Sequence, residues 1–193
     1  MADLELQPDG SRYDFVALCR ASRAVHERIL KTGPAPTFED LAGWEFDGAN
    51  TRPITAAMGI RKFIKGFYEG PPRTSRKGPE PYIQGYNIQV HGNDIEAPHV
   101  PKPSAENPRR GDFFRVHRVV PGARYSAYPQ AMLLNYRLGG DTWVPSSPLR
   151  DYIVQVYPDD KDLLLGIAFY NLGFPMYLSR FILRRRARHD FTG

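Results

Sequence analysis

The segment LRDYIVQVYPDDKDLLLGIAFYNLGFPMYLSRFILRR (residues 149–185) contains three runs of apolar and aromatic residues separated by two short polar turns. Aliphatic and aromatic residues predominate in each run, as they do in β-strands. The turns PDDKD (158–162) and NLGFP (171–175) contain the Pro, Asp, Asn and Gly residues that favour hairpin connections. Consecutive hairpins predict an antiparallel meander, with strands at 149–157, 163–170 and 177–185.

Similar runs precede this segment and bring the number of predicted strands to about eight, enough to close an up-and-down barrel around one small ligand. We therefore expect a mainly β protein of the α+β class, an antiparallel up-and-down barrel with an N-terminal helix. A helical turn is expected at residues 54–58. The earlier strands are expected at 43–48, 60–69, 82–91, 113–120 and 131–138.

An amphipathic helix is predicted at residues 11–32, where apolar side chains recur at a period near 3.6 and Gly33-Pro34 marks the end. We expect its apolar stripe to pack outside the barrel or across one end. Cys19 lies on that stripe and is expected to be structural and buried. It is the single cysteine, which excludes an intrachain disulfide and favours a reducing compartment.

The length of 193 residues suits one domain, expected to span residues 1–193, with the helix at 11–32, the barrel at 43–186 and a basic tail at 187–193. The start MADLELQPDG lacks the features of an export signal. No apolar run approaches the roughly 20 residues that a transmembrane helix needs. We therefore expect a cytoplasmic protein without a transmembrane segment.

The net charge of +5 is concentrated near the end of the chain, in the run RRRAR (184–188). This run is expected to be solvated and to make at most a weak contact with anionic surfaces. A nucleic-acid partner is disfavoured, because no RNP pattern, zinc-finger spacing or helix-turn-helix pair is present. The histidines lack the spacing of a metal site, so no metal and no cofactor is expected.

The helix, the Gly43-Trp44 pair in the first strand and an arginine-bearing last strand together resemble the lipocalin-like (calycin) β-barrels. In that family the first strand carries Gly-x-Trp and the last carries an arginine that packs over the tryptophan. Here Gly43 and Trp44 are adjacent, and Arg180 or Arg184 would be the counterpart of that arginine. The resemblance covers residues 43–186 and implies a barrel that binds small apolar molecules. The superfamily also includes some enzymes.

Polar residues interrupt several strands that otherwise look buried, and a buried polar group needs a partner. If these residues share the barrel interior, they form the polar end of an apolar cavity. Arginine and tyrosine suit such a site because they donate directed hydrogen bonds to an acid or carbonyl group. The long connection 91–112 is expected near the mouth. The predicted ligand-binding residues are Tyr86, Arg115, His117, Asn135 and Tyr152.

These features favour binding of a small hydrophobic or amphipathic molecule in a barrel cavity. An alternative is a cofactor-independent acid–base enzyme, such as an isomerase, cyclase or lyase, that uses the same cavity, for example through His117. A further alternative is a filled barrel that serves as a surface-interaction protein. No catalytic residue can be assigned, and alternating apolar positions do not distinguish a hollow barrel from a filled one.

Overall fold

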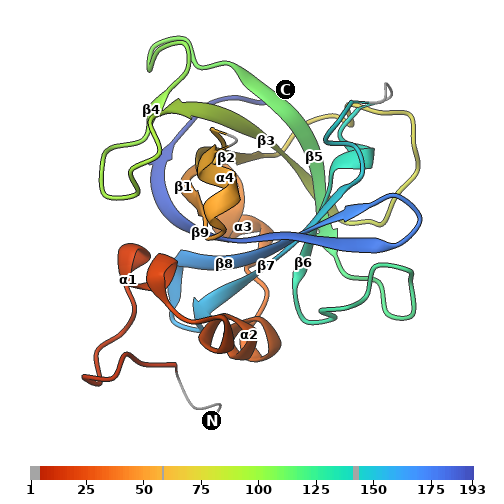
Figure 1. The fold of residues 1–193 in the computed structure, drawn as a ribbon. Coiled ribbons are helices and arrows are strands. Elements are labelled where there is room, and N and C mark those ends of the chain that lie inside the picture. Colours follow the sequence, from red (N-terminus) through yellow and green to blue (C-terminus); the bar gives the residue numbers. More distant parts are fainter. Residues whose placement is uncertain (1–4, 58, 141–143) are drawn as a thin grey trace.

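The protein folds into a closed antiparallel β-barrel, seen nearly end-on in the computed structural model of Figure 1, which describes residues 5–57, 59–140 and 144–193. Eight strands pair in the order β1-β2-β3-β5-β6-β7-β8-β9, and β9 pairs again with β1. The predicted antiparallel barrel is therefore confirmed. The strands are β1 (Trp44–Asn50), β2 (Lys62–Tyr68), β3 (Tyr82–His91), β5 (Arg110–Arg118), β6 (Met132–Asn135), β7 (Leu149–Tyr157), β8 (Asp160–Asn171) and β9 (Pro175–Arg188).

Two details differ from the expected strands. The short strand β4 (Val100–Pro101) pairs with the end of β3, outside the closed ring. The strand β6 has only four residues, because the chain turns into a 3-10 helix, η1 (Tyr136–Leu138), before it returns to the sheet. This turn carries the Tyr136 side chain into the barrel, where it packs against Phe114.

The predicted N-terminal helix is present as two shorter helices, α1 (Phe15–Arg20) and α2 (Arg23–Thr32). The break has a local cause: Ser22 is extended and its hydroxyl accepts a hydrogen bond from the Val25 amide, so it caps α2 instead of continuing α1. Both helices pack on the outer face of the barrel, beside β7, β8 and β9 (Figure 1).

Two further helices are short: α3 (Phe38–Leu41) precedes β1, and α4 (Pro53–Ala57) lies between β1 and β2. The latter corresponds to the helical turn expected at 54–58, although Met58 lies outside the described residues. No helix in the described part of the chain has the length and apolarity needed to cross a bilayer.

Apolar side chains are buried on both sides of the barrel wall. One cluster fills part of the interior and includes Phe46, Phe67 and Phe114. A second lies between the outer face and the two N-terminal helices, and a third covers β2 and β3 on the outside. Both faces of most strands are consequently apolar, which affects how well the sequence can predict the interior.

The residues that follow β9 are docked on the barrel and not solvated as a tail. Phe191 packs against Tyr68 and Tyr86, with ring centroids 5.0 Å and 5.1 Å away, and so covers the outer face of β2 and β3. The His189 imidazole hydrogen-bonds the Phe67 carbonyl at 3.0 Å. The C-terminal segment therefore contributes to the third apolar cluster.

Trp44 has arginine neighbours on β9, as in the calycin pattern, but they are not the residues expected. The guanidinium carbons of Arg185 and Arg188 lie 4.4 Å and 4.3 Å from the Trp44 ring centroid. Arg180 instead pairs with Glu27, and Arg184 pairs with Asp47 at 3.1 Å. The closed barrel is consistent with a calycin-like fold, with the stacked arginines displaced along the strand.

Candidate functional site

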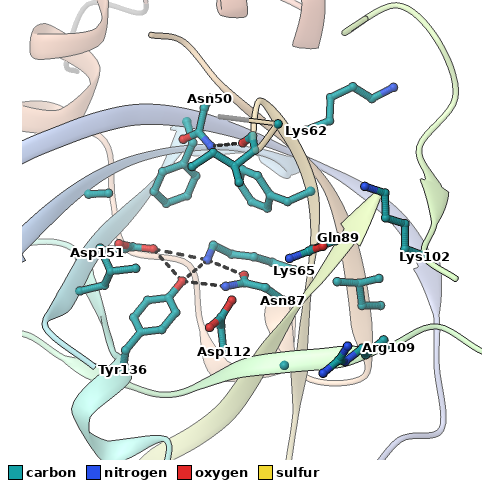
Figure 2. A pocket seen from close by; sticks show the side chains of 18 of the residues that line it. Asn50, Lys62, Lys65, Asn87, Gln89, Lys102, Arg109, Asp112, Tyr136 and Asp151 are labelled. Carbon is teal, nitrogen blue, oxygen red and sulfur yellow. Dashed lines mark hydrogen bonds and ion pairs between the residues drawn. The ribbon is translucent and has the colours of Figure 1, made fainter. Parts of the chain in front are cut away.

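A cavity of about 910 Å³ occupies part of the barrel interior (Figure 2). The interior is therefore neither hollow throughout nor filled, because the packed cluster around Phe46, Phe67 and Phe114 occupies the remainder. Apolar side chains form part of the cavity wall, and polar side chains form its floor and mouth. The apolar lining residues include Ile60, Phe63, Leu149, Ala168, Leu178 and Phe181.

Four polar side chains meet at the floor of the cavity, as Figure 2 shows. Lys65 Nζ donates to Asn87 Oδ1 at 2.9 Å and to the Tyr136 hydroxyl at 2.5 Å, and it pairs with Asp151 Oδ2 at 3.3 Å. The Tyr136 hydroxyl donates to Asp151 Oδ2 at 3.1 Å and accepts from Asn87 Nδ2 at 3.2 Å. We call these four residues the floor cluster. They come from β2, β3, η1 and β7.

Strand alternation explains why a lysine points inward. Phe63, Lys65 and Phe67 occupy successive inward positions of β2, so the ammonium lies among aromatic rings. Lys65 Nζ is 4.8 Å from the Phe114 ring centroid and 5.4 Å from that of Phe181. Ring faces attract a cation, and together with Asp151 they offset part of the cost of burying the charge.

Burial changes the acid–base behaviour of the floor cluster. It lowers the pKa of Lys65 and raises the pKa of Asp151, while the attraction between the two groups opposes both shifts. Burial also raises the pKa of the Tyr136 phenol well above its usual value, and the negative charge of Asp151 adds to that shift. Strongly shifted groups that face a cavity are typical of binding and catalytic sites, although structural networks produce them too.

A fifth polar residue, Asp112, lies beside the floor cluster in an unusual backbone conformation. The pairing of β3 with β5 shifts register, so that Asp112 and Phe113 together lie opposite Tyr86. At this bulge Asp112 has φ +44°. Among the described residues, it is the only non-glycine residue with a positive φ. Bulges of this kind re-aim side chains next to functional sites.

The bulge places the carboxylate of Asp112 in the cavity and leaves it exposed to solvent. In Figure 2 this carboxylate points toward Asn87 and Tyr136. A second hollow of about 370 Å³, lined by Arg73 and Ser147 among others, shares Asp112 and Tyr136 with the first. Asp112 therefore borders both hollows.

Cationic side chains surround the mouth of the cavity. Lys102 and Arg109 come from the connection between β3 and β5, the loop expected near the mouth, and His91 is exposed at its start. Among the described residues, neither Lys102 nor Arg109 forms an ion pair within 4.0 Å. Lys62 is held by the carbonyls of Ala97 and Pro98, at 2.8 Å and 3.1 Å. The mouth thus presents positive charge that is not neutralised locally.

None of the five ligand-binding residues expected from the sequence lines this cavity. Tyr86 packs in the third apolar cluster, and Tyr152 packs in the cluster beneath the N-terminal helices. Arg115, His117 and Asn135 occupy the same outer face of β5 and β6, because the inward positions are Phe114, Val116, Leu134 and Tyr136.

The expectation that these five residues face the cavity is therefore wrong. Their side chains lie on the outer face of the barrel, because the assumed alternation of inward and outward positions was shifted by one residue. Such a shift moves every side chain of a strand to the other face. It went unrecognised because helices and loops bury the outer face as well, so both faces look like a core. Whether the five residues contact a ligand outside the cavity stays a prediction.

The cavity residues are different ones, and the sequence carried a weak signal for two of them. Lys65 lies between Phe63 and Phe67 in a strand, and Asp151 lies in the apolar strand LRDYIVQVY. Lysine and aspartate are rare in strand centres, so each could have marked a special position. Nothing local connects residues 65 and 151, which meet only because the barrel closes.

The described residues contain no group of three or more His, Cys, Asp or Glu side chains that could hold a metal ion. Comparison with known proteins adds no assignment: no protein-family model matches the chain, and no curated protein or solved structure is significantly similar to it.

Proposed function

We propose that the barrel binds a small amphipathic molecule in its cavity, with an acidic group of the ligand at the mouth. The observation that carries this proposal is the division of the lining into three zones: an apolar wall, a cationic mouth and the polar floor cluster. Apolar rings such as Phe63 and Phe181 fit the body of a ligand, and Lys102 and Arg109 at the mouth fit an anionic group. The volume of about 910 Å³ lies within the range of drug-sized binding sites.

The floor cluster restricts the inner end of the ligand. All three protons of the Lys65 ammonium already have acceptors, and the Tyr136 hydroxyl already donates to Asp151. In contrast, Asp151 Oδ1 is buried without a hydrogen-bond donor, and Asp112 presents an exposed carboxylate. The inner end of the ligand should therefore carry a donor, such as a hydroxyl group.

Two experiments test this function. Native mass spectrometry of the protein purified from its own host should show a bound small molecule. In solution, anilinonaphthalene sulfonate, an apolar anion, should bind with saturable fluorescence. The double variant Lys102→Ala/Arg109→Ala should weaken that binding about tenfold or more, as expected when charge-assisted contacts are lost. Arg118→Ala, which removes an exposed arginine at the end of β5, is the matched control and should not.

A variant with a blocked cavity tests whether the fluorescent anion binds inside the barrel. Ala168 lies on the cavity wall, so Ala168→Trp should abolish binding of the fluorescent anion if the cavity holds it. Unchanged binding by this variant in folded form would show that the anion binds elsewhere, and the cavity proposal would be rejected.

A second candidate function, acid–base catalysis on the bound molecule, is favoured by Asp112. Its carboxylate is accessible, is held in an uncommon conformation and lies beside three groups that can relay protons. The test is incubation of the protein with a small-molecule extract of its host in deuterium oxide. Isomerisation or deuterium incorporation that Asp112→Asn abolishes would support catalysis, and an unchanged extract would leave binding alone as the function.

A further inference from the structure

We infer that the outer wall of the barrel carries a second binding site, for an oxyanion such as phosphate or carboxylate, formed by Arg115, Asn135 and Arg150 with His117 beside them. We call these four residues the outer arginine site. It is separate from the cavity and does not rest on the function proposed above.

The strand register brings these residues together. Arg115 on β5 lies opposite Asn135 on β6, and Asn135 lies opposite Arg150 on β7, so the three form one row across the outer face. His117 follows two positions after Arg115 on the same face. The charges of Arg115 and Arg150 both lower the pKa of His117, after the larger effect of burial, which places both guanidinium groups near the imidazole.

The side chains of this row are buried. Arg115 is 2% exposed, His117 is 3% and Arg150 is 4%. Two loops cover them: Arg115 donates to the Arg76 carbonyl at 3.4 Å and its guanidinium carbon lies 4.2 Å from the Tyr82 ring centroid. Arg150 donates to the carbonyls of Ser147 and Leu149 at 2.9 Å and 2.5 Å and stacks on Tyr125.

The two guanidinium groups have little negative charge near them in the described part of the chain, where Asp151, which faces the barrel interior, offsets the charge of Arg150 in part. Among the described residues, no carboxylate lies within 4.0 Å of Arg115 or Arg150. Their described partners are neutral carbonyls and rings. Burial lowers the pKa of Arg150, and the positive charge of the exposed Arg137 adds to that shift. Asp151 is next to Arg150 in sequence, but it points into the barrel and pairs with Lys65.

Several polar atoms of the site are also buried without a hydrogen-bond partner in the described part of the chain. These atoms are Arg115 Nε, Arg150 Nε, His117 Nε2 and Asn135 Oδ1. A guanidinium cannot lose its proton at any ordinary pH, so it cannot avoid the cost of burial by becoming neutral. A buried charge without a counter-charge is among the most destabilising features a protein can have.

The floor cluster shows the contrast, because there the single buried cation is matched by Asp151. An oxyanion would supply what the outer arginine site lacks: several acceptor oxygens and a negative charge between two guanidinium forks. His117 Nδ1 hydrogen-bonds the Arg118 carbonyl at 2.8 Å, which leaves Nε2 as an acceptor for a hydroxyl on the anion. Inorganic phosphate carries both features, whereas acetate carries only the charge.

The test measures the thermal midpoint of the full chain against rising inorganic phosphate or acetate, with chloride holding ionic strength constant. We expect a saturable rise of several degrees with phosphate, a smaller one with acetate, and none with chloride. Arg150→Gln should remove the rise with phosphate, and Arg118→Gln, an exposed arginine next to the site, should retain it. Because Arg150→Gln could fail to fold, the Nε–H resonances of wild-type Arg115 and Arg150 are followed as well, and phosphate should shift both.

No saturable rise in the wild type, together with unmoved Nε–H resonances, would overturn the inference. So would a rise of equal size in folded Arg150→Gln. The cavity variant Lys102→Ala/Arg109→Ala should keep the full response to phosphate. If that variant loses the response, the anion binds at the cavity mouth and the outer arginine site is rejected.

Discussion

Lys65 Nζ and Asp151 Oδ2 lie 3.3 Å apart and join opposite sides of the barrel. Lys65 is on β2 and Asp151 is on β7, which are four strands apart in either direction around the closed sheet. The two side chains are 3% and 4% exposed, and with Tyr136 and Asn87 they lie between the cavity and the packed part of the interior. The pair therefore forms part of the inner boundary of the cavity.

Removing one member of this pair should destabilise the protein more than removing both. In Asp151→Asn the Lys65 ammonium loses its counter-charge, and a loss of about 3 kcal/mol in unfolding free energy is expected. In Lys65→Met/Asp151→Leu no charge is left buried, so most of that loss should be recovered. Urea denaturation of the wild type, both single variants and the double variant measures the coupling. Additive losses would show that the two charges do not interact.

The sequence predicted the barrel because hairpin turns and alternating runs are local signals. It did not predict the interior, because closure is a property of the whole sheet and because both faces of the wall are buried. The bulge at Asp112 adds a second difficulty. It inserts one residue into β5, so that Arg110 and Phe113 point outward while Asp112 and Phe114 point inward. No fixed two-residue period gives that assignment.

The row Arg115–Asn135–Arg150 shows what the sequence could establish. These residues do share one face, as their alternation with apolar residues indicates. The alternation does not indicate, however, whether the shared face points into the barrel or away from it. A prediction based on packing volume would have the same difficulty, because the helices α1 and α2 and the loops supply a second core.

Stability should fall as the pH is lowered from about 7 to 5.5. Burial lowers the pKa of His26, His99, His117 and His189 in the folded protein below the usual value of about 6.5. The unfolded chain therefore binds more protons in this range, and the stability present above pH 6.5 is lost toward the folded pKa values, by at most about 1.4 kcal/mol per group and pH unit. Chemical denaturation at several pH values measures this slope.

One histidine can be isolated from the others by substitution. His26 hydrogen-bonds the Leu18 carbonyl at 2.8 Å and is 2% exposed, so His26→Gln should reduce the slope between pH 6.5 and 5.5. Val120→Ala, at an exposed position without a titratable side chain, is the control and should leave the slope unchanged. A steeper slope in His26→Gln would contradict the assignment.

The C-terminal segment should contribute measurably to stability. Phe191→Ala removes the ring that covers Tyr68, Tyr86 and Phe113, and a loss of about 2 kcal/mol is expected for a partly buried aromatic side chain. Asp190→Ala changes a neighbouring exposed residue and should have little effect. Equal midpoints of thermal unfolding for Phe191→Ala and the wild type would show that the segment is not docked in solution.

Cys19 should react slowly with thiol reagents while the protein is folded. The side chain is partly buried against the outer apolar cluster, and burial raises its pKa from 9.0 to about 12. A shift of that size lowers the thiolate fraction at pH 8 about a thousandfold, and the thiolate is the reactive form. The rate of modification should rise to that of a free thiol in denaturant. Rapid labelling of the native protein would contradict burial of this residue.

Substitutions at Asp112 should separate backbone strain from the role of its carboxylate. Its φ of +44° is easy for glycine, tolerated by asparagine and unfavourable for other residues. Asp112→Gly should therefore match or exceed the wild type in stability, Asp112→Asn should be close to it, and Asp112→Val should lose about 2 kcal/mol. If the carboxylate serves the ligand, Asp112→Asn should weaken ligand binding or turnover at unchanged stability. A stable Asp112→Val would show that the left-handed conformation is not maintained, whereas full function in Asp112→Asn would leave the bulge as a feature of barrel closure alone.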